Sequence, residues 1–216
     1  MKLYALTLSP FAMRARMALQ FKGQAYDMDP PPGGSTRSEA YLAINPIGKL
    51  PVLVTAEGLA IAESETIIDY LDDTFPEPPL MPADAGGRAQ ARNAVRCLEL
   101  YVTPAMSRLF RQMDPATRDA AIVDAELEQV RSGFALVEHF VDDATFAVGQ
   151  APSKADCMLL PSLLLADTLA EIFQQGNLLA HCPHLSGYRS KARLHHGMGA
   201  LWTETAEAMA RYRASA

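Results

Sequence analysis

Three short stretches carry groups that could bind a small polar ligand. In the first, Ser9 precedes Pro10. This pair is typical of a helix start, where the serine oxygen accepts an N–H of the first turn and proline takes the first helical position. The same hydroxyl could instead donate a hydrogen bond to an anion held at the positive end of the helix. Ser9 is therefore a candidate for anion stabilisation, with a plain helix cap as the alternative.

The second stretch, residues 45–53, runs from a turn-prone Asn45-Pro46 pair into a short apolar segment that reads as a strand. Pro51 cannot donate to a sheet, so we expect it at the first residue of the strand or on an edge, with Leu50 extended before it. An extended residue at that place leaves its N–H and C=O free to pair with a short peptide. An ordinary loop with an edge proline is the alternative.

The third stretch is the Glu63-Ser64 pair, which precedes an apolar helical pattern at Ile67, Ile68 and Leu71. A serine hydroxyl and the free N–H groups of a helix start suit a carboxylate, whereas a glutamate suits an ammonium group. The alternative is a helix cap followed by an acidic first turn.

The elements around these stretches alternate in type. We expect a strand over 3–8, a helix over 10–21 that ends at Gly23, a strand over 25–28, a hairpin from 51–54 and 59–61, and a helix from 63. A βαβ unit followed by ββα is the thioredoxin-like order. The predicted fold class is therefore an α/β thioredoxin-like N-terminal domain.

The rest of the chain reads as helical. Four prolines between residues 76 and 82 indicate a stiff connector. The predicted domains are 1–75, a linker at 76–83, and an all-α domain over 84–216. Its expected helices cover 84–113 with an interruption near Pro104, 116–141, a segment that begins with a capping box at Ser153 and Asp156, a segment from Pro183, and 200–213. His195 and His196 are expected to end a helix.

Composition excludes several classes of function. The chain has 216 residues and a net charge of −6, which argues against nucleic acid as a partner. No apolar run reaches the roughly 20 residues of a membrane span, and the N-terminus lacks a signal-peptide pattern.

The three cysteines are far apart, which fits a reducing cytoplasm. The cluster at His181, Cys182 and His184 lacks a second group of ligands, so no metal site is expected.

The ordered set of motifs resembles the cytosolic glutathione transferase family. The start of the first helix, with Ser9-Pro10-Phe11 and two arginines, is similar to omega-like and many bacterial members. The stretch 48–51 resembles the family's Gly-Lys-Val-Pro loop, and Glu63-Ser64 resembles its Glu-Ser motif. The resemblance covers essentially the whole chain. It implies glutathione as co-substrate, a homodimer, a cytoplasmic location and a role in detoxification.

The resemblance also implies a role for each site residue. The proline of the loop is cis in the family, and the preceding backbone, here Leu50, pairs with the cysteinyl part of glutathione. Lys49 would meet the glycine carboxylate, while Glu63 and Ser64 would hold the γ-glutamyl end. The implied catalytic residue is Ser9, and the implied glutathione-binding residues are Ser9, Phe11, Lys49, Leu50, Pro51, Glu63 and Ser64.

Ser9 stands where the omega pattern has a cysteine. With no thiol there, reduction through a mixed disulfide is disfavoured, and a serine-type transferase that adds glutathione to a small hydrophobic electrophile is favoured. Two alternatives stay open. One is a glutathione-dependent isomerase or dehalogenase on the same fold, and the other is a binding or interaction module without turnover.

Overall fold

The computed structural model describes residues 1–215, and the chain forms two compact units. The first unit contains residues 1–80 and the C-terminal helix from His196 onward, and the second runs from Met81 to His195. The last helix thus packs in the first unit, although the sequence grouped it with the other C-terminal helices. The limits at 75 and 84 stay a prediction.

The first unit is built on a mixed four-stranded sheet with the strand order β2-β1-β3-β4. Its strands are β1 (Lys2–Tyr4), β2 (Asp27–Asp29), β3 (Val52–Val54) and β4 (Ala60–Ala62). β1 is parallel to β2, while β3 is antiparallel to both β1 and β4. Leu3, Leu53 and Ile61 lie opposite one another across the three strands and are buried. This confirms the predicted thioredoxin-like class.

The strands are shorter than the sequence predicts. β1 stops at Tyr4 instead of residue 8, because the chain turns after it and the Ser9 N–H donates to the Leu6 carbonyl at 3.0 Å. β2 begins at Asp27, two residues later than expected. The early turn matters for the site, since it sets where the next helix starts.

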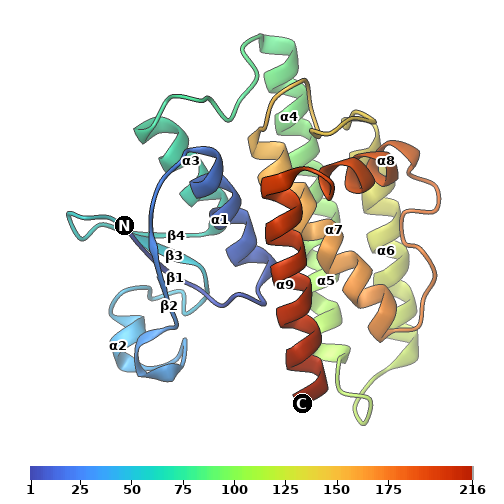
Figure 1. The fold of residues 1–216 in the computed structure, drawn as a ribbon. Helices are drawn as coiled ribbons and strands as arrows, with labels where there is room; N and C mark the ends of the chain where they lie inside the picture. Colours follow the sequence, from blue (N-terminus) through green and yellow to red (C-terminus); the bar gives the residue numbers. More distant parts are fainter. Residues whose placement is uncertain (216) are drawn as a thin grey trace. The chain divides into compact units, whose positions relative to one another are not determined.

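Two long helices of this unit, α1 (Pro10–Phe21) and α3 (Ser64–Thr74), pack side by side (Figure 1). The Lys22 ammonium, at the end of α1, pairs with Asp72 of α3 and donates to the Pro78 carbonyl. The Lys22 side chain is fully buried, so this ion pair lies in a low-dielectric environment, where it joins the two helices. The short helix α2 (Glu39–Leu42) lies between β2 and β3 in the chain.

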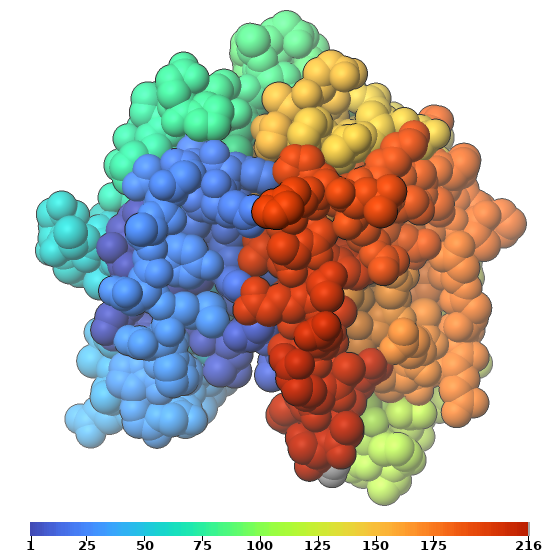
Figure 2. Space-filling model, in the orientation of Figure 1, coloured from blue at the N-terminus to red at the C-terminus, as the bar shows by residue number. Residues whose placement is uncertain are grey.

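Helix α9 (His196–Ser215) packs against α1, and its outer side forms part of the surface drawn in red in Figure 2. The Arg16 guanidinium bonds to Glu204 of α9 at 2.6 Å. The expectation that His195 and His196 end a helix is wrong, since His196 begins α9. Glycine disfavours helix locally. At Gly197, however, the packing of α9 against α1 outweighs this low helix propensity.

The second unit is helical, as predicted. Its helices are α4 (Ala85–Cys97), α5 (Thr103–Leu109), α6 (Ala120–Glu138), α7 (Lys154–Ile172) and α8 (Pro183–Ala192). A π-helical turn, Leu98–Val102, joins α4 to α5 just before Pro104. Pro104 has no N–H to donate to the Leu100 carbonyl, which explains why the regular α-helix is interrupted here. No helix in residues 1–215 has the length and apolar character needed to cross a membrane.

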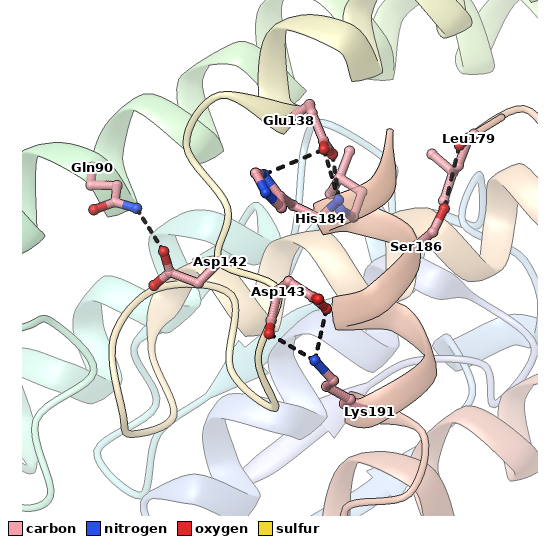
Figure 3. A network of polar contacts seen from close by, with 9 residues as sticks. Gln90, Glu138, Asp142, Asp143, Leu179, His184, Ser186 and Lys191 are labelled. Carbon is pink, nitrogen blue, oxygen red and sulfur yellow. Dashed lines mark hydrogen bonds and ion pairs between the residues drawn. The ribbon is translucent and has the colours of Figure 1, made fainter. Parts of the chain in front are cut away.

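Hydrogen bonds and an ion pair connect the end of α6 and the segment after it to α8 (Figure 3). Glu138 accepts the backbone N–H groups of His184 and Leu185 at 2.7 and 2.9 Å, and so caps the start of α8. The Lys191 ammonium of α8 pairs with Asp143 at 2.8 Å. These contacts hold a segment without regular structure against α8.

A buried capping box starts α7. Asp156 is fully buried, and its carboxylate accepts the N–H groups of Ala147 and Ser153 at 2.7 Å each, and the Ser153 hydroxyl at 3.0 Å. Burial raises the pKa of Asp156 to about 6, opposed by these donors. The carboxyl group thus joins the preceding loop to the helix, as the Ser153 and Asp156 pattern predicts.

We expect Asp156→Ala to lower the free energy of unfolding by about 3 kcal/mol, because two buried N–H groups lose their acceptor. Ser153→Ala, which removes only a hydroxyl, should cost about 1 kcal/mol. Denaturant unfolding monitored by circular dichroism measures both. Equal costs for the two variants would contradict this reading of the capping box.

The same carboxyl group predicts a pH dependence. Its folded pKa of about 6 lies above the usual value near 3.8, so the folded state holds the proton more tightly than the unfolded state. The stability that protonation of Asp156 contributes is fully present below about pH 4 and is lost as the pH rises through 6. The difference between the wild type and Asp156→Ala should therefore be larger at the lower pH.

Candidate functional site

The sheet brings the three predicted stretches to one end. Tyr4, the last residue of β1, pairs with Val52, the first residue of β3, and Val52 pairs with Ala62, the last residue of β4. The chain therefore leaves β1 toward Ser9, enters β3 from Pro51 and leaves β4 into Glu63 at the same end of the sheet. Strand direction alone places the starts of α1 and α3 and the Leu50 backbone in one region.

Ser9 is the N-cap residue of α1, as the sequence predicts. Its backbone is extended, and its oxygen accepts the Ala12 N–H at 3.3 Å, which is long for such a bond. Accepting this bond leaves the hydroxyl hydrogen available for donation. The first turn of α1 carries no acidic residue. Its positive end is therefore available to an external anion, with a half-buried hydroxyl beside it.

Leu50 presents free backbone groups just ahead of β3. The Leu50–Pro51 peptide bond is cis, as the resemblance implies. Among residues 1–215, neither the N–H nor the C=O of Leu50 takes part in a hydrogen bond. The residue is half-buried, and β3 starts two positions later. Leu50 can therefore pair with an extended peptide laid beside it.

The carbonyl of Lys49 is held by two donors that sequence reasoning did not assign. It accepts the Tyr41 hydroxyl at 2.6 Å and the Asn45 side-chain amide at 2.9 Å. Both side chains are buried, with exposed fractions of 0% and 2%. The Asn-Pro turn signal marked Asn45 as a loop residue, but no local pattern distinguishes a tyrosine four residues earlier.

Glu63 and Ser64 begin α3. Glu63 has a φ of 65°, which is unfavourable for a residue with a side chain and costs about 1–3 kcal/mol. Its side chain makes no cap bond to the helix and is exposed, so the first-turn N–H groups stay open toward a ligand. Ser64 is buried, with 6% exposed, and in the described part of the chain its hydroxyl has no hydrogen bond.

The other two predicted ligand residues are Phe11 and Lys49. The Phe11 ring lies against the Arg14 guanidinium at 4.8 Å, which orients it on the first turns of α1. Lys49 is exposed and follows Gly48, whose φ is 66°. Their contact with a ligand stays a prediction.

The cysteines do not form an alternative reactive centre. All three are free thiols, and Cys157 and Cys182 are buried. Burial, helped by the charge of Glu138, raises the pKa of Cys182 to about 11, and burial also raises the pKa of Cys97. These two groups stay protonated near neutral pH and are poor nucleophiles. Across residues 1–215, no group of three or more metal-ligating side chains is close enough to hold an ion.

Comparison with known proteins gives a consistent result. Residues 3–79 match the model of the glutathione S-transferase N-terminal domain, and residues 98–193 match that of the C-terminal domain. A maleylacetoacetate isomerase of Pseudomonas aeruginosa is 33% identical over 183 residues, which are 77% of this chain and 82% of that protein. A maleylpyruvate isomerase of Ralstonia sp is 31% identical over 172 residues, or 76% and 81% of the two chains.

A solved structure has the same fold. The holo structure of a maleyl pyruvate isomerase, described as a bacterial glutathione S-transferase of the zeta class, superposes with a TM-score of 0.77 at 25% identity. The match covers 93% of this chain and 96% of the other. Together with both domain models and the curated relatives, this shows that the chain belongs to the glutathione S-transferase family.

Proposed function

We propose that this protein binds glutathione at the end of the sheet where α1 and α3 begin, and uses its thiolate to isomerise a small cis alkene conjugated to a carbonyl group. The observation that carries the proposal is the convergence of two open helix starts and the free Leu50 backbone at one sheet end. The reaction type rests on the relatives named maleylacetoacetate and maleylpyruvate isomerases.

The groups at this sheet end match glutathione part by part. The N–H and C=O of Leu50 suit the cysteinyl backbone, because both peptide groups can pair as neighbouring strands do. The Ser64 hydroxyl and the first N–H groups of α3 suit the γ-glutamyl carboxylate. The exposed Glu63 carboxylate suits the γ-glutamyl ammonium, and Lys49 suits the glycine carboxylate.

The sulfur then lies toward Ser9. A helix N-terminus lowers the pKa of a thiol, because the N–H groups and the helix dipole favour the anion. The Ser9 hydroxyl adds a hydrogen-bond donor to the thiolate, and it does not need to remove the proton itself. This role makes Ser9 the proposed catalytic residue and makes the enzyme a serine-type member of its family.

The proposed isomerisation is balanced without another reactant. The thiolate forms a C–S bond to one alkene carbon, and the alkene electron pair moves to the conjugated carbonyl oxygen as an enolate. The former double bond is then a single bond and rotates. When the enolate collapses, the C–S bond breaks, the trans alkene forms and the thiolate is returned.

Conjugation is the second candidate, because a relative with a transferase name matches at the same identity as the maleylacetoacetate isomerase. A probable glutathione S-transferase of Zea mays is 33% identical over 179 residues, or 75% of this chain. In conjugation, the enolate takes a proton on carbon and the C–S bond is kept. The homodimer and the cytoplasmic location that the resemblance implies stay predictions.

Glutathione consumption separates the two reactions. With a maleyl substrate, we expect trans product to form only when glutathione is present, while the total thiol concentration stays constant. A fall in thiol that matches the substrate consumed would establish conjugation in place of isomerisation. Calorimetry with glutathione alone is the companion measurement, and absence of binding there would contradict the proposed function.

A further inference from the structure

The Lys49 carbonyl oxygen accepts two hydrogen bonds from buried side chains. Tyr41, on α2, donates its hydroxyl at 2.6 Å, and Asn45 donates its side-chain amide at 2.9 Å. A carbonyl oxygen has two lone pairs, so these two donors satisfy it and fix its direction.

The two donors are themselves held firmly. The Tyr41 ring packs edge-on against Tyr4 of β1, with ring centroids 6.2 Å apart. The Asn45 oxygen accepts the Ile47 N–H at 3.1 Å, and the Asn45 backbone carbonyl accepts the Gly48 N–H at 3.0 Å. Burial raises the pKa of Tyr41, so its hydroxyl remains a donor near neutral pH. The sheet and the turn therefore hold the carbonyl through these two side chains.

The direction of the Lys49 carbonyl determines the direction of the Leu50 N–H. Both groups belong to the same planar trans peptide unit, in which the C=O and N–H point in opposite directions. With the oxygen turned toward Tyr41 and Asn45, the Leu50 N–H points away from them. That N–H has no hydrogen bond within residues 1–215, which leaves it available to a ligand.

We infer that Tyr41 and Asn45 are positioning residues, which aim the Leu50 N–H at the cysteinyl carbonyl of glutathione by fixing the Lys49–Leu50 peptide plane. The inference rests on the proposed function, because it assigns a partner to Leu50. Because this peptide plane is already fixed, glutathione binding does not have to order it, and the entropic cost of binding is lower.

The test compares Tyr41→Phe, Asn45→Ala and the double variant by calorimetry with glutathione, at a temperature where each is folded. One lost donor leaves the other in place, so we expect each single variant to raise the Kd about fivefold. The double variant should raise it by more than the product of the two, since only then is the plane free to rotate. The kcat at saturating glutathione should change little.

A matched control removes a tyrosine hydroxyl elsewhere in the same unit. The Tyr26 hydroxyl accepts the Arg16 side chain at 3.1 Å, so Tyr26→Phe should lower stability without changing the Kd for glutathione. A purely structural role for Tyr41 and Asn45 would give this result for their variants too. Unchanged affinity in the double variant, while the wild type binds, would overturn the inference and leave the proposed function standing.

Nuclear magnetic resonance provides a readout that does not depend on a variant. With selectively ¹⁵N-labelled leucine, the Leu50 amide of the wild type should shift downfield and become protected from exchange when glutathione is added. The double variant should show a smaller shift at saturation. A Leu50 amide that does not respond in a wild type that binds glutathione would contradict the inference. A wild type that binds no glutathione would instead refute the proposed function on which it rests.

Discussion

Replacing Ser9 with alanine should lower kcat about a hundredfold, because the loss of one preorganised donor to a developing or bound anion has an effect of this size. The Kd for glutathione should change only a few-fold, since the rest of the tripeptide keeps its contacts at Leu50, Glu63 and Ser64. Steady-state kinetics with a maleyl substrate, together with calorimetry, separates the two effects. The pKa of bound glutathione, read from thiolate absorbance, should rise in the variant.

Two controls distinguish this role from helix capping. Ser9→Ala also removes the acceptor for the Ala12 N–H, which should cost about 1 kcal/mol of stability. Asp119→Ala removes the cap of α6, whose oxygen accepts the Ala121 N–H at 2.9 Å, and should lower stability without lowering kcat. Ser9→Thr keeps a hydroxyl and should recover much of the rate. If Ser9→Ala and Asp119→Ala behaved alike in both assays, Ser9 would be only a cap.

Ser64→Ala should produce the largest loss of glutathione affinity, about tenfold or more, because a hydrogen bond to a charged carboxylate would disappear from a buried position. The kcat at saturating glutathione should stay close to that of the wild type, since the contact is equal in the ground state and the transition state. Calorimetric titration measures the first effect, and saturation kinetics the second.

Glu63→Gln should weaken binding less, because the side chain is exposed and the ion pair is screened by solvent. The glutamine keeps the side-chain size at the positive-φ position, so this variant isolates the charge. Thr66→Ala, an exposed position in the same helical turn, is the matched control and should leave affinity unchanged. Equal small effects at Ser9, Glu63 and Ser64 would contradict the division of roles.

Local signals were enough to find the residues that begin elements. Serine followed by proline predicted the start of α1, and the Ser153 and Asp156 pair predicted the capping box of α7. These motifs act through hydrogen bonds within a few residues, so the sequence carries them directly. The order of strands and helices followed from apolar periodicity and turn residues, whereas the pairing that brings the three stretches to one sheet end is seen only in the structure.

Contacts between distant segments were not predictable in this way. Nothing near Tyr41 indicates that its hydroxyl meets the Lys49 carbonyl, because the contact depends on the turn between α2 and β3 and on the packing of the Tyr41 ring against Tyr4. The positive φ of Glu63 also has no local signature, since glycine or asparagine is the usual residue there. The start of α9 was missed because the packing of this helix against α1, which no local pattern reveals, outweighs the low helix propensity of Gly197.

A crystal structure of the protein with glutathione would show whether the tripeptide binds at the end of the sheet where α1 and α3 begin. We expect the cysteinyl backbone to pair with the N–H and C=O of Leu50 and the γ-glutamyl carboxylate to lie on Ser64 and the start of α3. The sulfur should lie within hydrogen-bonding distance of the Ser9 hydroxyl. A tripeptide bound elsewhere, or bound here with its sulfur turned away from the start of α1, would contradict this expectation.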